Sequence, residues 1–339
     1  MDNAVIKNFV MEKKQIMPIE KGTVLAVAGP TASGKTALGV ALARALGGEI
    51  ISADSMQIYR GMDVGTAKIT AEEARGIPHH LLDIRRPGEN FSAADYQLLA
   101  REEIRRLLEA GKLPIFVGGT GLYLYAALYN YDFSQGENRE ESHKSRLIRA
   151  ELEKEADSRG SRWLWEELKK VDAASAEKIH ENDRKRLIRA LEYHRLYGRP
   201  ISRNREALTA PKLLYPTRFL GLFTQRQLLY RRIDRRVDQM LEQGLEAEVK
   251  ALKNQGLTLN SQAGQAIGYK QMLEYFQGNT SYEEAVRRIK QESRRYAKRQ
   301  LTWFGRNPDI LWLDSQKLGD QAFVEGLIRD LRPANPPLS

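Results

Sequence analysis

A stretch near the N-terminus, residues 23–36, decides the fold: Thr23-Val24-Leu25-Ala26-Val27-Ala28-Gly29-Pro30-Thr31-Ala32-Ser33-Gly34-Lys35-Thr36. Residues 23–28 form a short apolar run with β-branched side chains, which predicts a buried strand. Residues 29–36 fit the pattern G-x-x-x-x-G-K-[ST] at every fixed position. Residues 35–46 are rich in Ala and Leu and are followed by two glycines, which predicts a helix. The order of strand, loop and helix indicates a phosphate-binding loop rather than an accidental glycine turn.

This loop combines several groups that bind phosphate. Its glycines let successive backbone N–H groups turn toward one anion, and the following helix adds its positive N-terminal end. Lys35 brings a positive charge to the phosphates, and the hydroxyl of Thr36 is a candidate ligand for Mg²⁺, the expected cofactor. The residues expected to hold the phosphates are Gly29, Pro30, Thr31, Ala32, Ser33, Gly34, Lys35 and Thr36. The pattern predicts a polyphosphate ligand and does not identify it as ATP.

The rest of the chain alternates apolar runs with helical patterns. We expect further strands at 49–53, 79–84, 113–117, 218–223 and 310–313, and helices at 93–110, 227–243 and 281–304. Such alternation predicts a central parallel sheet flanked by helices. Residues 137–199 show no convincing strand and are charged and helix-prone. We therefore predict an α/β protein with a core like that of the P-loop nucleoside triphosphatases, residues 1–131 and 200–339, and an all-helical insertion domain, residues 132–199.

The composition narrows the classes of partner. The chain has 339 residues, enough for about two domains, and a formal net charge of +10, which favours polyanions and above all nucleic acid. The absence of cysteine excludes a disulfide framework, a thiol nucleophile and thiolate metal sites. Residues 116–129 are too short for a membrane span, and residues 1–22 lack the apolar stretch of a secretory signal. We expect a cytoplasmic protein without a membrane anchor.

Two further loops are expected beside the phosphates. Asp54 follows the second predicted strand, so its carboxylate should lie at the carboxyl end of the sheet, where ligands bind in open α/β folds. There it would hold Mg²⁺ or accept a proton from a nucleophile; the alternative is an Asp that only caps a turn or helix. Gly118-Gly119-Thr120-Gly121 follows the fourth strand and lets backbone and a hydroxyl approach the same pocket. An ordinary strand-to-helix turn is the alternative.

Two predicted helices are strongly basic. The first carries Arg226, Arg231, Arg232, Arg235 and Arg236 against Asp234, and Arg226, just after a strand, is expected to reach the phosphates. The second is basic over much of its surface. Between residues 287 and 306, Glu292 is its single acidic residue. A solvated helix face usually alternates its charges, so the imbalance favours a footprint for a phosphate backbone over a merely solvated face. The five histidines show no metal-binding spacing.

A set of motifs extends over nearly the whole chain. Besides residues 29–36 it comprises Asp-Ser-Met-Gln-Ile-Tyr at 54–59, Gly-Met-Asp-Val-Gly-Thr-Ala-Lys at 61–68, Pro-His-His at 78–80, Phe-Ser at 91–92, Gly-Gly-Thr-Gly-Leu-Tyr at 118–123, Asn-Asp at 182–183, Gly-Tyr at 268–269 and Lys-Arg-Gln-Leu-Thr-Trp-Phe at 298–304. Together these motifs resemble the bacterial tRNA dimethylallyltransferases, also called tRNA isopentenyltransferases. The joint set is highly specific, whereas the phosphate loop alone is not.

The resemblance implies a reaction. A dimethylallyl group would pass from dimethylallyl diphosphate to the exocyclic amine of the adenosine just 3′ of the anticodon. The loop would then hold a diphosphate leaving group, whose developing charge Lys35, Arg226, loop amides and Mg²⁺ would stabilise. In the family the Asp that matches Asp54 is the base, and the Thr that matches Thr120 lies beside it at the adenosine. The target base must leave the anticodon-loop stack to enter such a pocket.

The resemblance also implies a set of tRNA contacts, with the helical insertion around the anticodon stem-loop. The matching positions are Asp54, Ser55, Met56, Gln57, Thr120, Asn182, Asp183, Arg184, Lys185, Arg186, Gln265, Gly268, Tyr269, Lys270, Arg294, Lys298 and Arg299. Two positions depart from the family: Lys270 stands where Arg is common, and the Arg that usually follows Trp-Phe is displaced to Arg306 by Gly305. Lys keeps the charge but loses the bidentate fork, so one contact is expected to differ. We expect a monomer.

Three other functions remain open from the sequence. A small-molecule kinase with Asp54 as base would leave the basic C-terminal helix unexplained. Prenylation of a free adenine nucleotide is closer, but the long insertion and the charge of +10 favour a larger polyanion. A non-catalytic RNA-binding protein would bind tRNA without forming a product.

Overall fold

The computed structural model describes residues 16–131, 139–202 and 212–332, with side chains at 139–143 excepted. The chain divides into two compact units. The larger unit combines Met1–Tyr129 with Leu213–Ser339, and the smaller unit is Asn130–Lys212.

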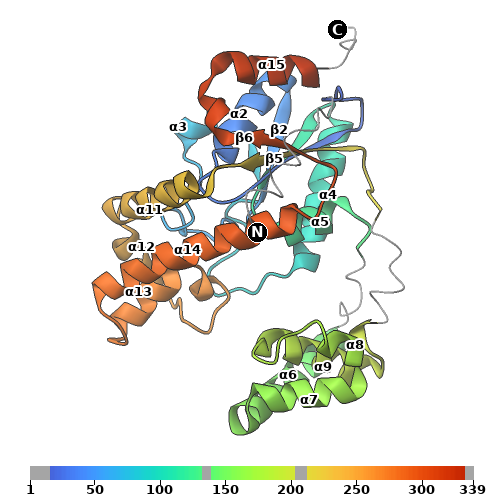
Figure 1. Ribbon diagram of the computed structural model, residues 1–339, viewed down its shortest axis with the longest axis vertical. Coiled ribbons are helices and arrows are strands. Elements are labelled where there is room, and N and C mark those ends of the chain that lie inside the picture. Colours follow the sequence, from blue (N-terminus) through green and yellow to red (C-terminus); the bar gives the residue numbers. More distant parts are fainter. Residues whose placement is uncertain (1–15, 132–138, 203–211, 333–339) are drawn as a thin grey trace. The chain divides into compact units, whose positions relative to one another are not determined.

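A parallel sheet forms the centre of the larger unit (Figure 1). Its described strands are β1 (Val24–Ala28), β2 (Gly48–Ala53), β3 (His79–His80), β4 (Leu113–Gly118), β5 (Thr217–Phe223) and β6 (Ile310–Asp314). Their order is β3-β2-β4-β1-β5-β6, and every pairing is parallel. β1 pairs with β4 on one side and β5 on the other, so the strand that leads into the phosphate loop is central. The predicted α/β fold is confirmed.

Helices cover both faces of this sheet. The helices of the larger unit are α2 (Lys35–Leu46), α3 (Ala71–Ala74), α4 (Ala93–Glu109), α5 (Gly121–Leu128), α11 (Arg226–Glu242), α12 (Leu245–Asn254), α13 (Tyr269–Phe276), α14 (Tyr282–Phe304) and α15 (Gln321–Leu331), with 3₁₀ turns at Ala263–Gln265 and Ser315–Gly319. On one face, Leu25 and Val27 of β1 pack in a core with residues of α2 and α15. α4 and α5 pack together and contact β2 and β4. The basic helices predicted at 227–243 and 281–304 are α11 and α14.

The strand predicted at 79–84 is shorter than expected. β3 ends at His80, because Leu81 and Asp83 take left-handed backbone conformations with φ of 62° and 55°, which break an extended chain. The next residues are tied to the loop after β2 instead, since Arg85 N–H donates to the oxygen of Ile58 (3.0 Å).

The smaller unit is helical in its described residues. It contains α6 (Arg139–Arg159), α7 (Ser161–Val171), α8 (Ala173–Ala176) and α9 (Arg184–Tyr197), which enclose a core of their own. The unit continues past residue 199, where the sequence placed its end, to Lys212. The reason is local: Ile201 packs against this core, and Ser202 N–H donates to the carboxylate of Asp172 (3.0 Å).

Candidate active site

The phosphate-binding loop lies between β1 and α2, at the carboxyl end of the sheet. Gly29 has φ of +145°, and a Cβ there would lie 2.8 Å from the main-chain oxygen of Leu222 on the neighbouring strand. Only glycine therefore lets the loop leave the sheet at this point. Ala32 takes a left-handed conformation with φ of 61°, and Gly34 precedes α2 with φ of 91°. The predicted loop therefore turns sharply before its helix begins.

Lys35 is held inside this loop. Its Nζ donates to the main-chain oxygen of Pro30 (2.6 Å), and the hydroxyl of Ser33 donates to the same oxygen (2.8 Å). Burial lowers the pKa of Lys35 to about 7; the nearby Arg236 lowers it further, and Asp54 opposes both. The loop thus contains a lysine whose protonation an incoming anion would favour.

Asp54 follows β2 directly, as predicted. Its Oδ1 accepts the backbone N–H of Met56 (2.9 Å) and of Gln57 (3.4 Å), so the carboxylate does shape a turn. The same side chain also lines two pockets. The turn fixes the direction in which the carboxylate faces the pockets, and the role of Asp54 as a base or metal ligand stays a prediction.

Thr120 lies beside Asp54 through the backbone. Although Thr120 precedes α5, its hydroxyl makes no helix cap; it accepts the N–H of Ser55 (3.1 Å) instead. Its own N–H donates to the oxygen of Ala53 (3.0 Å). The loops after β2 and β4 are thereby joined.

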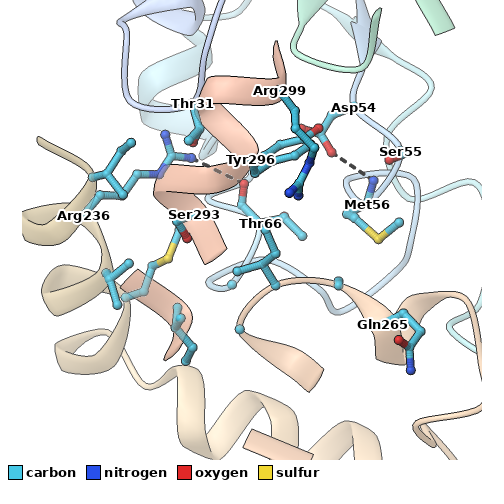
Figure 2. A pocket seen from close by; sticks show the side chains of 18 residues that line it. Thr31, Asp54, Ser55, Met56, Thr66, Arg236, Gln265, Ser293, Tyr296 and Arg299 are labelled. Carbon is cyan, nitrogen blue, oxygen red and sulfur yellow. Dashed lines mark hydrogen bonds between the residues drawn. The ribbon is translucent and has the colours of Figure 1, made fainter. Parts of the chain in front are cut away.

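Two pockets meet at Asp54. The wide pocket has a volume of about 300 Å³ and is lined by residues that include Ser55, Met56, Gln265, Gly268 and Arg299 (Figure 2). The narrow pocket has a volume of about 90 Å³ and is lined by residues that include Lys35, Thr36, Ser52, Gln57 and Gly119. Five residues line both pockets: Thr31, Asp54, Thr66, Arg236 and Tyr296. A ligand on the phosphate loop and a ligand in the wide pocket would therefore meet at the carboxylate. A third pocket, of about 810 Å³, also borders the loop and is lined by residues that include Lys35, Thr36 and Arg236.

The arginine that faces the phosphate loop is Arg236, and the prediction for Arg226 was wrong. Arg226 is exposed at the start of α11, where its Nε donates to the hydroxyl of Tyr230 (3.2 Å). Arg236 lines all three pockets, and its Nη2 donates to the oxygen of Thr66 (3.5 Å). Within the described part of the chain, its Nε is buried without a partner, and burial lowers the pKa of the guanidinium. The sequence does contain a signal for Arg236, because this residue lies next to the buried stripe of α11, between Ile233 and Val237.

Tyr296 and His79 are two of the pocket residues that were not predicted. Tyr296 of α14 lines both pockets, and burial, reinforced by Asp54, raises the pKa of its hydroxyl to about 12. His79 lines the narrow pocket; its Nδ1 lies 2.8 Å from the oxygen of Ile77, and Nε2 is buried without a partner among the described residues. Burial lowers the pKa of His79 and so favours the neutral ring. Tyr296 shares the inward face of its helix with Ile289 and Gln300, a pattern visible in the sequence.

The residues predicted to contact tRNA lie in several parts of the structure. Asp54, Ser55, Met56, Gln265, Gly268 and Arg299 line the wide pocket, and Gln57 the narrow one. Lys298 is exposed, whereas Lys270 is partly buried and Arg294 forms an ion pair with Asp234. Thr120 lies at Ser55 as described above.

Tyr269 is a correction to this set. Its ring is fully buried (0% exposed), and its hydroxyl donates to the carboxylate of Glu248, so the side chain is not presented to a ligand.

The remaining residues predicted to contact tRNA belong to the smaller unit: Asn182, Asp183, Arg184, Lys185 and Arg186. There Asp183 caps α9 and Arg184 pairs with Asp157 (2.6 Å), while Lys185 and Arg186 are exposed.

Fold and site together define a class of protein. It is an α/β protein in which the phosphate pocket of a G-x-x-x-x-G-K-[ST] loop opens, past a carboxylate, into a second pocket that can hold an acceptor. The family described as IPP transferase matches residues 57–307 of this chain. The chain belongs to this family, and its relatives at 48–50% identity in two Geobacillus species are tRNA dimethylallyltransferases.

Individual relatives agree over most of the chain. The tRNA dimethylallyltransferase of Geobacillus thermodenitrificans is 50% identical over 291 residues, covering 86% of this chain and 90% of the relative. A crystal structure of the full-length tRNA isopentenylpyrophosphate transferase from Bacillus halodurans is 44% identical with a TM-score of 0.66, covering 91% of this chain and 98% of that one. A eukaryotic dimethylallyltransferase acting on tRNA gives a TM-score of 0.75 at 29% identity, covering 93% of this chain and 81% of that one. The residues described contain no helix long and apolar enough to cross a membrane.

Proposed function

We propose that this enzyme transfers a dimethylallyl group from dimethylallyl diphosphate to the exocyclic amine of the adenosine immediately 3′ of the anticodon in tRNA, and releases diphosphate. The observation that carries this proposal is the position of Asp54, which lines both the narrow pocket at the phosphate loop and the wide pocket beside it. A base at this junction can serve an acceptor amine while a diphosphate leaves on the other side.

In the narrow pocket we assign the diphosphate to the phosphate loop. Lys35 and Arg236 supply positive charge, and loop amides supply hydrogen bonds, where the negative charge develops as the allylic C1–O bond breaks. The unpartnered Nε of Arg236 supports this assignment, because a buried donor without a partner is costly and an anion would satisfy it. Thr36 lines the same pocket and is the residue that would hold Mg²⁺.

The residues of the narrow pocket fit a metal that arrives with its substrate. Among the residues described, no cluster of three or more His, Asp or Glu could hold a metal ion by itself. A single threonine hydroxyl suits Mg²⁺, which keeps water and substrate phosphate oxygens among its ligands. When bound, the ion would neutralise part of the charge on the diphosphate.

In the wide pocket we assign the flipped adenosine. The exocyclic nitrogen forms the new bond to C1 and loses a proton to the carboxylate of Asp54, while the electron pair of the C1–O bond leaves with diphosphate. Thr120 and Tyr296 would orient the base beside Asp54, since the hydroxyl of Thr120 accepts the N–H of Ser55 and Tyr296 lines both pockets. Exposed basic residues of α14, including Lys298 and Arg299, are assigned to the tRNA backbone. We propose that the enzyme acts as a monomer.

Nucleoside mass spectrometry tests the reaction. Unmodified tRNA is incubated with the protein, Mg²⁺ and dimethylallyl diphosphate, without ATP. A gain of one five-carbon prenyl unit on the adenosine beside the anticodon supports the proposal. A gain on free AMP but not on tRNA would select the prenylation of a free nucleotide. No gain on either substrate would overturn the assignment of dimethylallyl diphosphate as donor. A small-molecule kinase and a non-catalytic RNA-binding protein would then be the functions to test.

A further inference from the structure

Gln300 connects the two loops of the site. It lies on α14 and is 5% exposed. Its Oε1 accepts the backbone N–H of Thr31 in the phosphate loop (2.9 Å), and its Nε2 donates to the main-chain oxygen of Gly119 (3.0 Å). Gly119 directly precedes Thr120, so one buried amide from a third element links the diphosphate side of the site to the acceptor side.

The space around this amide is restricted. A Cβ at Gly119 would lie 1.9 Å from Nε2 of Gln300, so the absence of a side chain at 119 is what admits the amide. Tyr296, one turn earlier on α14, lines the narrow pocket together with Gln300. The amide is therefore held from two sides, by the phosphate loop and by the loop after β4.

The bond to Thr31 has a consequence for the phosphate loop. The N–H of Thr31 is committed to Gln300 and is not free to point at an anion. This hydrogen bond therefore fixes the conformation of the phosphate loop, and the N–H of Thr31 does not serve to bind phosphate.

We propose that Gln300 is a positioning residue that sets the alignment of the allylic carbon with the acceptor amine. The inference rests on the proposed function. Transfer requires C1 of the donor, held through its diphosphate, to lie in line with the nitrogen beside Asp54 and Thr120. Because a displacement of about 1 Å between reacting groups can cost about a hundredfold in rate, a residue that joins both loops acts on the chemical step.

The test replaces Gln300 by Met, which keeps the length of the side chain and removes both hydrogen bonds. Gln97→Met is the matched control: Gln97 is also buried, and its Nε2 donates to the oxygen of Ala126 (2.8 Å), away from both pockets. Both variants lose a buried amide. We measure kcat and KM for tRNA and for dimethylallyl diphosphate, together with thermal unfolding. We expect Gln300→Met to lower kcat about 10- to 100-fold with each KM within about threefold, and Gln97→Met to leave kcat within about threefold.

A second variant approaches the same amide from the opposite side. Gly119→Ala displaces Nε2 without removing it and should give the same loss of kcat even if Gln300→Met does not fold. The inference is overturned if the folded Gln300→Met or Gly119→Ala enzyme retains kcat within threefold of the parent, or if only KM changes. Failure of the parent to prenylate tRNA would instead refute the proposed function, so the two failures are distinct.

Discussion

The guanidinium of Arg236 donates to the main-chain oxygen of Thr66, and this contact places a buried cation of α11 at the edge shared by all three pockets. Thr66 also accepts from the side-chain amide of Gln57 (3.3 Å), so the same oxygen organises residues of both substrate pockets. Its loop is fixed in turn by Glu248, whose carboxylate accepts the N–H groups of Asp63 (2.9 Å) and Val64 (2.7 Å).

Replacement of Arg236 should impair use of the donor. Arg236→Ala removes a buried charge at the phosphate loop, and we expect kcat/KM for dimethylallyl diphosphate to fall about 10- to 100-fold, corresponding to about 1.5–3 kcal/mol for a charged hydrogen bond. Arg226→Ala is the matched control on the same helix, because Arg226 is exposed and bonded to Tyr230. Steady-state kinetics with varied donor checks both. A larger effect at position 226 than at 236 would reverse the assignment.

Asp54→Asn should separate chemistry from binding. Asn keeps an oxygen that can accept the N–H of Met56, so the turn is retained, but it cannot accept a proton at neutral pH. We expect kcat to fall about 10²- to 10⁴-fold, the usual contribution of a general base. The affinity for the anticodon stem-loop, measured by fluorescence anisotropy, should change by less than about threefold. Full turnover in this variant would exclude Asp54 as the base.

Lys35 should make donor binding depend on pH. Burial and Arg236 lower its pKa to about 7 in the free enzyme, and a bound diphosphate favours the protonated form and so raises that pKa. Between the two values binding takes up a proton, so the affinity is greatest at low pH and falls as the pH rises above 7. Calorimetry with inorganic diphosphate at pH 8, in buffers of different ionisation enthalpy, measures this uptake. Lys35→Met should bind diphosphate without taking up that proton. Equal proton uptake by both proteins would assign the proton to a group other than Lys35.

The sequence predicted the sheet and the phosphate loop because their signals are local. An apolar run next to a glycine pattern specifies β1 and its loop whatever surrounds it. The path after His80 was missed because left-handed residues at 81 and 83 depend on contacts with the loop after β2. Arg226 was favoured over Arg236 because nearness to a strand end can be read from the sequence, whereas the place of Arg236 beside three pockets cannot. Tyr269 was assigned outward from its motif, but its partner Glu248 is 21 residues away along the chain.

Tyr269→Phe should therefore affect stability rather than recognition. The change removes the hydroxyl that donates to Glu248 and leaves the buried ring in place. We expect a loss of about 1.5–3 kcal/mol in the free energy of unfolding, as for a hydrogen bond to a charged group. Urea denaturation measures this loss, and anticodon stem-loop affinity should stay within about twofold. Unchanged stability with weakened tRNA binding would restore Tyr269 as a contact residue.

Lys298 and Arg294 lie one turn apart on α14 but should respond differently to substitution. Lys298 is exposed, whereas Arg294 is partly buried, pairs with Asp234 and lies over the ring of Tyr230. A lysine that neutralises one phosphate contributes about one unit to the slope of log affinity against log salt. We expect Lys298→Ala to weaken tRNA binding and reduce that slope by about one, and Arg294→Ala to lower the stability of the protein with a smaller change in slope. Filter binding from 50 to 300 mM salt distinguishes them, because an ion pair already formed within the protein releases no counterion from tRNA. Equal slopes for Lys298→Ala and the parent would place the phosphate contacts on other residues.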